Sequence, residues 1–207
     1  MAHTVIKNIS EFAAALAEIP LAPGKTRFFR GHSDYKKYKV EPSIFRKDYL
    51  IANEENLIHE AIIRCPSELP SSLSMFEVLV RLQHYSLPTR LLDLTSNALV
   101  ALYFACRHKE KTEGEVLVFD IPNEQVKYYE SDTVSIISNI AKRNKNFDLT
   151  KLPADKEAFN SNEEIGRLLH DIRRDKPAFR PIIDAADLRR VIAVRTRLDN
   201  ARIAKQE

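Results

Sequence analysis

Side chains suited to binding phosphate cluster at several places in this sequence, where polar residues interrupt apolar stretches. An arginine presents a planar fork that binds phosphate oxygens in pairs, and the first turn of a helix presents free backbone N–H groups. Arg30, Arg90 and the helix start in "DLTSN" supply both features. We therefore expect a nucleotide- or phosphate-binding site lined by Arg30, Gly31, His32, Gln83, His84, Arg90, Asp93 and Ser96. A further polar cluster ends the sequence, at Arg202, Gln206 and Glu207.

Each of these residues also has a purely structural interpretation. Arg30 could form an ion pair with Asp93 or with the end of a helix, and Thr95 or Ser96 could cap the helix that follows. Gly31 is explained either by the end of a strand or by the close approach of a ligand to the backbone. Buried arginines are costly to satisfy one at a time. We therefore predict that the polar clusters share one site, in which three residues lie close together: Arg30, Arg90 and Asp93.

Several common catalytic and binding motifs are absent from the sequence. It contains no GxSxG, GxxxxGK[ST], GxGxxG or HExxH motif, and no metal-binding spacing of cysteines. With only 4 glycines, the chain cannot build a glycine-rich phosphate loop. A phosphate site must therefore use the arginine forks, and no metal is expected in it.

The elements that would position these residues follow from the hydrophobic pattern. "TRFFRG" (26–31), "EVLVFDI" (115–121) and "RRVIAVRT" (189–196) have the composition of strands. Helical spacing predicts five helices outside the longest apolar run, at 11–19, 53–65, 74–85, 131–143 and 162–174. Ser10 is a plausible N-cap for the first helix, and Pro42 is placed to open a short turn of helix.

The longest apolar run, Ala98 to Cys106, predicts a helix over 97–108 that is apolar nearly all round. We expect this helix to be the most buried element, and we expect both Cys65 and Cys106 to be buried free thiols. The fold class is α+β: a single domain with a mostly helical N-terminal half and a small strand core. Residues 1–25 form an N-terminal helix and linker, and 120–185 form a helical subdomain.

The net charge is close to neutral, with 32 Lys and Arg against 29 Asp and Glu. This balance gives little support to nucleic-acid binding by the chain as a whole. The segment 171–207 is more basic, with 10 Lys and Arg against 6 Asp and Glu, and a solvated helix face explains it better than a phosphate-bearing partner does. The sequence shows no signal segment and no apolar run that could span a bilayer, so we expect a soluble cytoplasmic protein.

Two stretches together resemble the FRG domain family, which takes its name from an aromatic-Arg-Gly motif. They are "FFRGHSDYKKYKVEPSIFR" and "LQHYSLPTRLLDLTSNALVALYFAC". The matching features are Arg30-Gly31 after an aromatic residue, a Pro-Ser-x-x-Arg motif, and Gln-His-Tyr-x-x-Pro-Thr-Arg-Leu-Leu-Asp-x-Thr, in the family's order. "NARIAKQE" resembles the family's C-terminal Arg-Ile-x-x-Gln segment, which usually continues into glycine and an aromatic residue; whether the natural chain continues past Glu207 is left open.

The sequence departs from the family at three packing and turn positions. The family often has Gly where Ser86 stands, Trp where Leu94 stands and Pro where Ala98 stands. The family occurs in bacteria and their phages and is often suspected in defence or toxin systems. The resemblance therefore implies the domain and a setting of this kind.

A weaker resemblance links the chain to ADP-ribosyltransferases, which use NAD as a substrate. Those enzymes combine an Arg-Gly or His-Gly strand, a Ser/Thr or Tyr motif and a final Glu or Gln. The resemblance implies catalytic roles for Arg30, Thr95, Gln206 and Glu207, with a protein or a nucleic acid as the acceptor. The alternatives are a non-catalytic module that senses a nucleotide or phosphate, and a nucleic-acid-binding protein. The oligomeric state is left open, and no membrane partner is expected.

Overall fold

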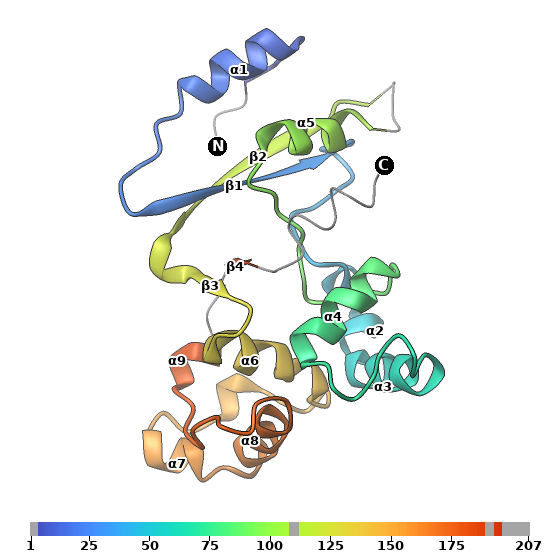
Figure 1. The fold of residues 1–207 in the computed structure, drawn as a ribbon, viewed down its shortest axis with the longest axis vertical. Helices are drawn as coiled ribbons and strands as arrows, with labels where there is room; N and C mark the ends of the chain where they lie inside the picture. Colours follow the sequence, from blue (N-terminus) through green and yellow to red (C-terminus); the bar gives the residue numbers. More distant parts are fainter. Residues whose placement is uncertain (1–3, 108–111, 189–192, 196–207) are drawn as a thin grey trace. The chain divides into compact units, whose positions relative to one another are not determined.

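A computed structural model describes residues 4–107, 112–188 and 193–195 of the chain (Figure 1). Helices and a small antiparallel sheet are both present, so the predicted α+β class is confirmed. The chain divides into two compact units, each built from two separate stretches of sequence. Unit 1 comprises 1–35 and 94–124, and unit 2 comprises 36–93 and 125–207.

A two-stranded antiparallel sheet forms the centre of unit 1. Strand β1 (Lys25–His32) pairs with β2 (Glu115–Pro122) over eight rungs, with Phe29 opposite Val118. Both strands were predicted from sequence, because their runs of aromatic and branched residues fit a pleated surface. Backbone hydrogen bonds of 2.7 and 2.8 Å also join Phe29 to Thr95, so the other edge of β1 is paired at Phe29.

Helix α5 (Ala98–Cys106) packs directly on the backbone of this sheet, and two glycines make room for it. A Cβ atom on Gly31 would lie only 1.7 Å from the Ala101 carbonyl oxygen, and one on Gly114 would lie 2.1 Å from the Ala105 oxygen. Gly31 therefore lies inside β1 rather than at its end, and the space beside it is filled by α5. A side chain at either glycine would push the helix off the sheet.

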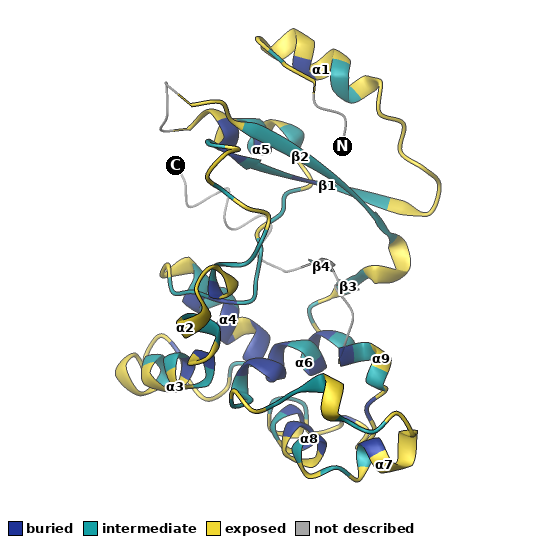
Figure 2. Cartoon of the chain, turned by 180° about the vertical axis from the view of Figure 1, so that it is seen from behind, coloured by how far each residue is buried: buried dark blue, intermediate teal, exposed yellow. Residues whose placement is uncertain are grey.

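The prediction that α5 is the most buried element is wrong. Only Ala101 and Ala105 of this helix are buried, whereas Leu99 and Tyr103 are more than half exposed (Figure 2). The reason is that α5 contacts the sheet through its small residues, which leaves its larger apolar side chains facing away. The cysteines also depart from expectation, since both Cys65 and Cys106 are exposed.

Side chains other than those expected cap the helices of unit 1. Helix α1 (Ile9–Ala17) begins at Asn8, whose side chain accepts a hydrogen bond from the Glu11 N–H, so the predicted Ser10 cap is wrong. Asn97 caps α5 by accepting from the Leu99 N–H, in place of Thr95 or Ser96. Asparagine competes well with serine and threonine for this position, so composition alone does not choose between neighbours.

Unit 2 is mostly helical and contains two hydrophobic cores. One core joins α3 (Glu54–Arg64) and α4 (Met75–His84) to the turn η3 (Ile140–Lys142). The other surrounds α8 (Glu163–Asp175), whose inner residues Ile165, Leu168 and Ile172 are fully buried. The remaining helices and turns are η1 (Ser43–Arg46), α2 (Asp48–Ile51), α6 (Asp132–Asn139), η4 (Leu149–Lys151), α7 (Lys156–Asn160) and α9 (Ala185–Leu188).

Several local features of unit 2 follow from the sequence. Ser74 and Glu77 form a complete capping box at the start of α4, and Ser131 caps α6 by accepting a hydrogen bond from the Val134 N–H. Ser86 adopts a φ of 65°, the left-handed conformation that glycine tolerates best. A short parallel pair, β3 (Val126–Tyr128) and β4 (Ala193–Arg195), completes the unit. Of these strands, only β4 was predicted.

No helix in the described part of the chain combines the length and the apolar character needed to cross a membrane.

Candidate functional site

One face of the sheet in unit 1 carries Arg30 and His32. Side chains alternate between the two faces of a strand, so Phe28, Arg30 and His32 share one face, and Phe29 and Gly31 share the other. Because α5 packs beside Gly31, it covers the Phe29 face. Arg30 therefore lies on the face that α5 leaves uncovered, where it is partly exposed. We call this surface the arginine face of the sheet.

A carboxylate from the neighbouring strand lies on the arginine face as well. Glu115 stands opposite His32 in the register, and directly opposite residues have their side chains on the same face. The His32 Nε2–H donates to Glu115 Oε2 at 2.9 Å, and the imidazole is 7% exposed. One rung of this surface thus carries an imidazole and a carboxylate, and the arginine fork stands two residues away along β1 on the same face.

Thr95 and Ser96 lie elsewhere in unit 1. Because Thr95 is hydrogen bonded directly opposite Phe29, its side chain belongs to the α5 face of the sheet, away from Arg30. Its Oγ1 accepts the Asn97 N–H at 3.1 Å, which fixes the turn into α5. Ser96 is exposed in that same turn. The threonine therefore organises the start of the helix.

In unit 2, the remaining motif residues form a connected cluster. The turn η1 carries Ser43, whose Oγ accepts the Thr89 N–H at 3.1 Å, and the Ile44 N–H donates to the Thr89 carbonyl at 3.3 Å. Thr89 is 1% exposed. The Pro-Ser-x-x-Arg and Pro-Thr-Arg motifs, 46 residues apart in sequence, are therefore joined by backbone and side-chain hydrogen bonds.

The fork of Arg90 binds a carboxylate of the protein itself. Arg90 Nε donates to both oxygens of Glu54 at 2.8 Å, and a terminal nitrogen also donates to Oε2. Glu54 is 3% exposed, and its burial raises the pKa of the carboxyl above the ordinary value, although the charge of Arg90 partly offsets this. The guanidinium carbon also lies 5.9 Å from the centre of the Phe45 ring. Within unit 2, Arg90 therefore has the coordination of a structural ion pair.

Gln83, His84 and Asp93 lie near the end of α4. Gln83 Nε2 donates to Asp93 Oδ2 at 3.0 Å, which ties the helix to the loop that follows Arg90. His84 is exposed and its ring packs edge-on against Tyr85, whose hydroxyl donates to Glu68 at 2.8 Å. The Gln-His-Tyr element thus supports the loop, with the histidine at the surface.

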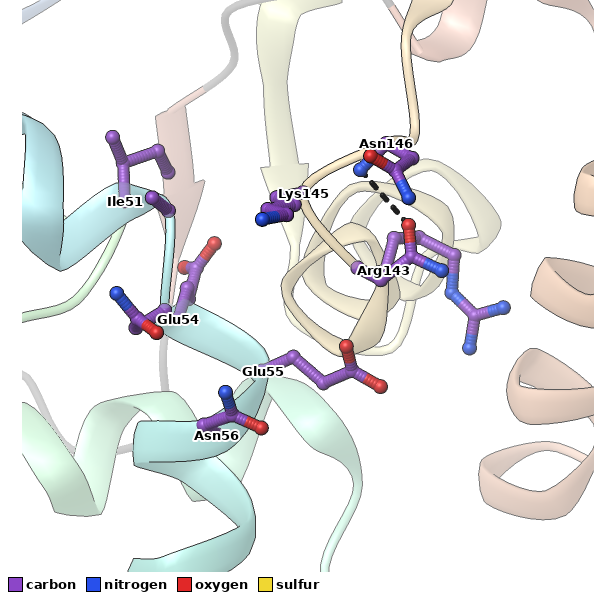
Figure 3. A pocket seen from close by; sticks show the side chains of 10 residues that line it. Ile51, Glu54, Glu55, Asn56, Arg143, Lys145 and Asn146 are labelled. Carbon is purple, nitrogen blue, oxygen red and sulfur yellow. Dashed lines mark hydrogen bonds between the residues drawn. The ribbon is translucent and has the colours of Figure 1, made fainter.

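A polar hollow of about 260 Å³ opens beside Glu54 in unit 2 (Figure 3). One wall is the start of α3, with Glu54 and Glu55, and the other is the loop after η3, with Arg143 and Lys145. Glu55 extends from its wall toward Arg143. Two acids and two bases balance one another, so the hollow favours a neutral or zwitterionic molecule over a phosphate. No group of three or more His, Cys, Asp or Glu in the described residues could hold a metal ion.

The expected site residues are thus divided between the units. Arg30, Gly31, His32, Thr95 and Ser96 belong to unit 1, and Gln83, His84, Arg90 and Asp93 to unit 2. Gln206 and Glu207 lie outside the described residues. Arg90 and Asp93 have different partners, Glu54 and Gln83. The expected approach of Arg30 to Asp93 stays a prediction.

Sequence reasoning missed two carboxylates, Glu54 and Glu115. Glu54 looked like an ordinary acid in the first turn of a helix, where negative charge is common. The signal available was Arg90, which needs a counter-charge when it is half-buried. Glu115 could be found only from the strand register, because that register places it beside His32.

Comparison with known proteins supports the resemblance read from the motifs. Residues 25–114 match the model of the FRG domain. The match spans β1 through α5 and contains all the motifs from Arg30 to Thr95, whereas Glu115 and the helices from α6 onward lie beyond it. No curated protein and no solved structure matches the chain.

Proposed function

We propose that the FRG domain at residues 25–114 binds a dinucleotide such as NAD on the arginine face, and that it transfers ADP-ribose to an acceptor. The observation that carries this proposal is the shared sheet face of Arg30, His32 and Glu115, in which His32 stands opposite Glu115 and Arg30 lies two residues away along β1. Such a surface offers a fork for a diphosphate beside a carboxylate for the ribose.

The chemistry needs these two groups close together. In the transfer, the bond between ribose C1′ and nicotinamide breaks and its electron pair leaves with nicotinamide. A nucleophilic atom of the acceptor bonds to C1′ and releases a proton. Positive charge builds on the ribose during this step, and a nearby carboxylate stabilises it. Glu115 is the candidate for that role among the described residues, beside the expected Gln206 and Glu207.

The charge distribution favours unit 1 over unit 2 as the phosphate site. The Arg90 fork is filled by Glu54, and the hollow beside Glu54 has balanced charge. Glu115, the acid on the arginine face, interacts with His32.

The test is to measure NAD binding by thermal shift and calorimetry, and nicotinamide release by chromatography. Arg30→Lys should weaken binding by about tenfold or more, because a lysine cannot form the bidentate contact. Glu115→Gln should lower turnover by about 10²–10³-fold with a smaller change in affinity. Glu113→Gln, an exposed neighbour, is the matched control and should behave like the unmodified chain.

The outcomes separate the two candidate functions. NAD binding that depends on Arg30 but yields no nicotinamide would refute the transferase and support a non-catalytic nucleotide sensor. A chain that neither binds nor cleaves NAD would refute both. A role in bacterial or phage defence, or as a toxin, rests on the family resemblance and would be tested by expressing the active and Arg30→Lys chains in bacteria.

A further inference from the structure

Neither packing nor backbone conformation in the described fold explains why residue 166 is a glycine. It lies inside α8, is exposed, and a Cβ atom there would have no described heavy atom within 4 Å. By contrast, Gly31 and Gly114 admit the backbone of α5, and Gly24 has a positive φ of 74°. Glycine weakens an exposed helix relative to alanine, so a bare position here is a cost that packing does not explain. Close approach of a partner to the helix would explain it.

The acids near the end of α8 point inward and are neutralised there. Asp171 pairs with Arg143, and its side chain is only 13% exposed. Asp175 is 11% exposed and accepts hydrogen bonds from the Met75 N–H, Asn139 and Lys142. Neither carboxylate is therefore available to balance charges on the outer face of the helix.

The bases of the same segment point outward. His170, Arg173 and Arg174 are exposed and follow Gly166 at spacings of four, seven and eight residues, which places them on the same side of the helix. Neither of these arginines forms an ion pair with a described residue, whereas Arg167, one residue after Gly166, pairs with Glu163 and Glu164. The exposed Arg180 follows shortly after. We call this surface, from Gly166 to Arg174, the basic face of α8. This face combines a position without a side chain, Gly166, with two arginines that form no ion pair with a described residue.

We propose that the basic face of α8 binds the phosphate backbone of a nucleic acid. Guanidinium forks match phosphate oxygens, and a missing side chain lets the backbone of the helix approach the strand. The basic face has no aromatic or large apolar residue, which a protein interface core would need. The apolar side of α8 is buried in the core of unit 2, so the helix cannot lie in a membrane surface. This inference does not rest on the proposed NAD chemistry.

The test uses fluorescence anisotropy with a labelled 20-nucleotide single strand and the corresponding duplex, over a range of salt concentrations. The unmodified chain should bind with steep salt dependence. Arg173→Glu combined with Arg174→Glu should weaken binding at least tenfold, and it should reduce the slope of log K against log salt on duplex by about 1.8, for two lost phosphate contacts.

Two controls separate a local surface from a general charge effect. Lys39→Glu combined with Lys47→Glu makes the same change in net charge at exposed sites away from α8, and it should have little effect. Gly166→Ala should raise Tm by about 2–4 °C yet weaken binding several-fold, because the added methyl group blocks close approach. Equal losses for the two double variants, unchanged binding by Gly166→Ala, or equal competition by poly-glutamate would overturn the proposal.

Discussion

The two units of the molecule are held together in different ways. Unit 2 has two hydrophobic cores in which branched side chains interdigitate around α4 and α8. Unit 1 has few buried side chains, and α5 packs on its sheet through alanines that touch glycines. Side chains can shift to fill or release space, but backbone cannot move without breaking hydrogen bonds. Unit 1 should therefore be the less tolerant of a small added group.

Each unit also contains an arginine–carboxylate pair, and the pKa of the carboxyl is shifted differently in the two pairs. Arg27 and Asp120 in unit 1 form a bidentate pair at 2.6 and 2.7 Å, and hydrogen bonding to Arg27 lowers the pKa of Asp120. In unit 2, burial raises the pKa of Glu54 despite its contact with Arg90. Similar contacts thus shift the carboxyl pKa in opposite directions, because the side chain of Asp120 is 24% exposed and that of Glu54 is only 4% exposed. The burial of the carboxyl therefore decides whether its pKa rises or falls.

The largest effect should come from Gly31→Ala. The new Cβ would meet the Ala101 carbonyl oxygen at 1.7 Å, so α5 or the sheet must move. We expect a loss of about 3 kcal/mol or more in the free energy of unfolding, measured by urea denaturation. Gly166→Ala is the control, since open space surrounds that position. Equal stability of the two variants would contradict the view that backbone contact holds unit 1.

The next effect should come from Arg90→Met, which removes the cation that pairs with Glu54. We expect a loss of about 2–3 kcal/mol at neutral pH, because a buried carboxylate would be left without a counter-charge. Burial already raises the pKa of Glu54 above its ordinary 4.5 in the unmodified chain, so this carboxyl's contribution to stability falls as pH rises through that raised pKa. Arg90 opposes this rise, so urea denaturation across this pH range should show a steeper fall for the variant, and an equal fall in both chains would contradict the role of the pair.

Asp120→Asn should have a smaller effect on the free energy of unfolding, and its pH dependence should run in the opposite direction. Its pKa is lowered from 3.8 in the folded chain, so the stability that it contributes is present above that value and is lost as pH falls through the folded pKa. The variant should lose about 1 kcal/mol at pH 7, because the pair is partly solvated. The difference from the unmodified chain should vanish in acid, and a constant difference would show that the ion pair is not its source.

The smallest effect should be a gain, from Ser86→Gly. Relief of the left-handed φ of 65° should outweigh the added freedom of the unfolded chain by about 0.5 kcal/mol. Thermal unfolding followed by circular dichroism would measure the change. Ser71→Gly, in a turn without positive φ, is the matched control and should lose a few tenths of a kcal/mol.

Local elements of the fold were largely predictable. The strands at 26–31 and 115–121 and the helices at 53–65 and 74–85 follow from periodicity and capping, which depend on neighbouring residues. The short β3 was missed because three residues carry too little pattern. The burial of α5 was misjudged because its composition is apolar all round, while its contacts are made through alanines.

The candidate site was predictable only in part. Arg30 and Arg90 could be selected by residue type, but their roles depend on partners far away in sequence. Glu54 stands 36 residues from Arg90, and Glu115 stands 83 residues from His32. No local pattern encodes such pairs, because they arise from strand register and helix packing.

The sequence by itself determined the α+β class, the main strands and helices, and the arginine-containing motifs that lie within the match to the FRG domain model. These depend on side-chain chemistry and short-range spacing, which a linear chain contains in full. Only the tertiary structure decided that Gly31 admits a helix, that Arg90 is held by Glu54, and that Arg30 shares a sheet face with Glu115. The physical reason is that burial and pairing are properties of neighbours in space, and folding selects those neighbours from distant parts of the chain.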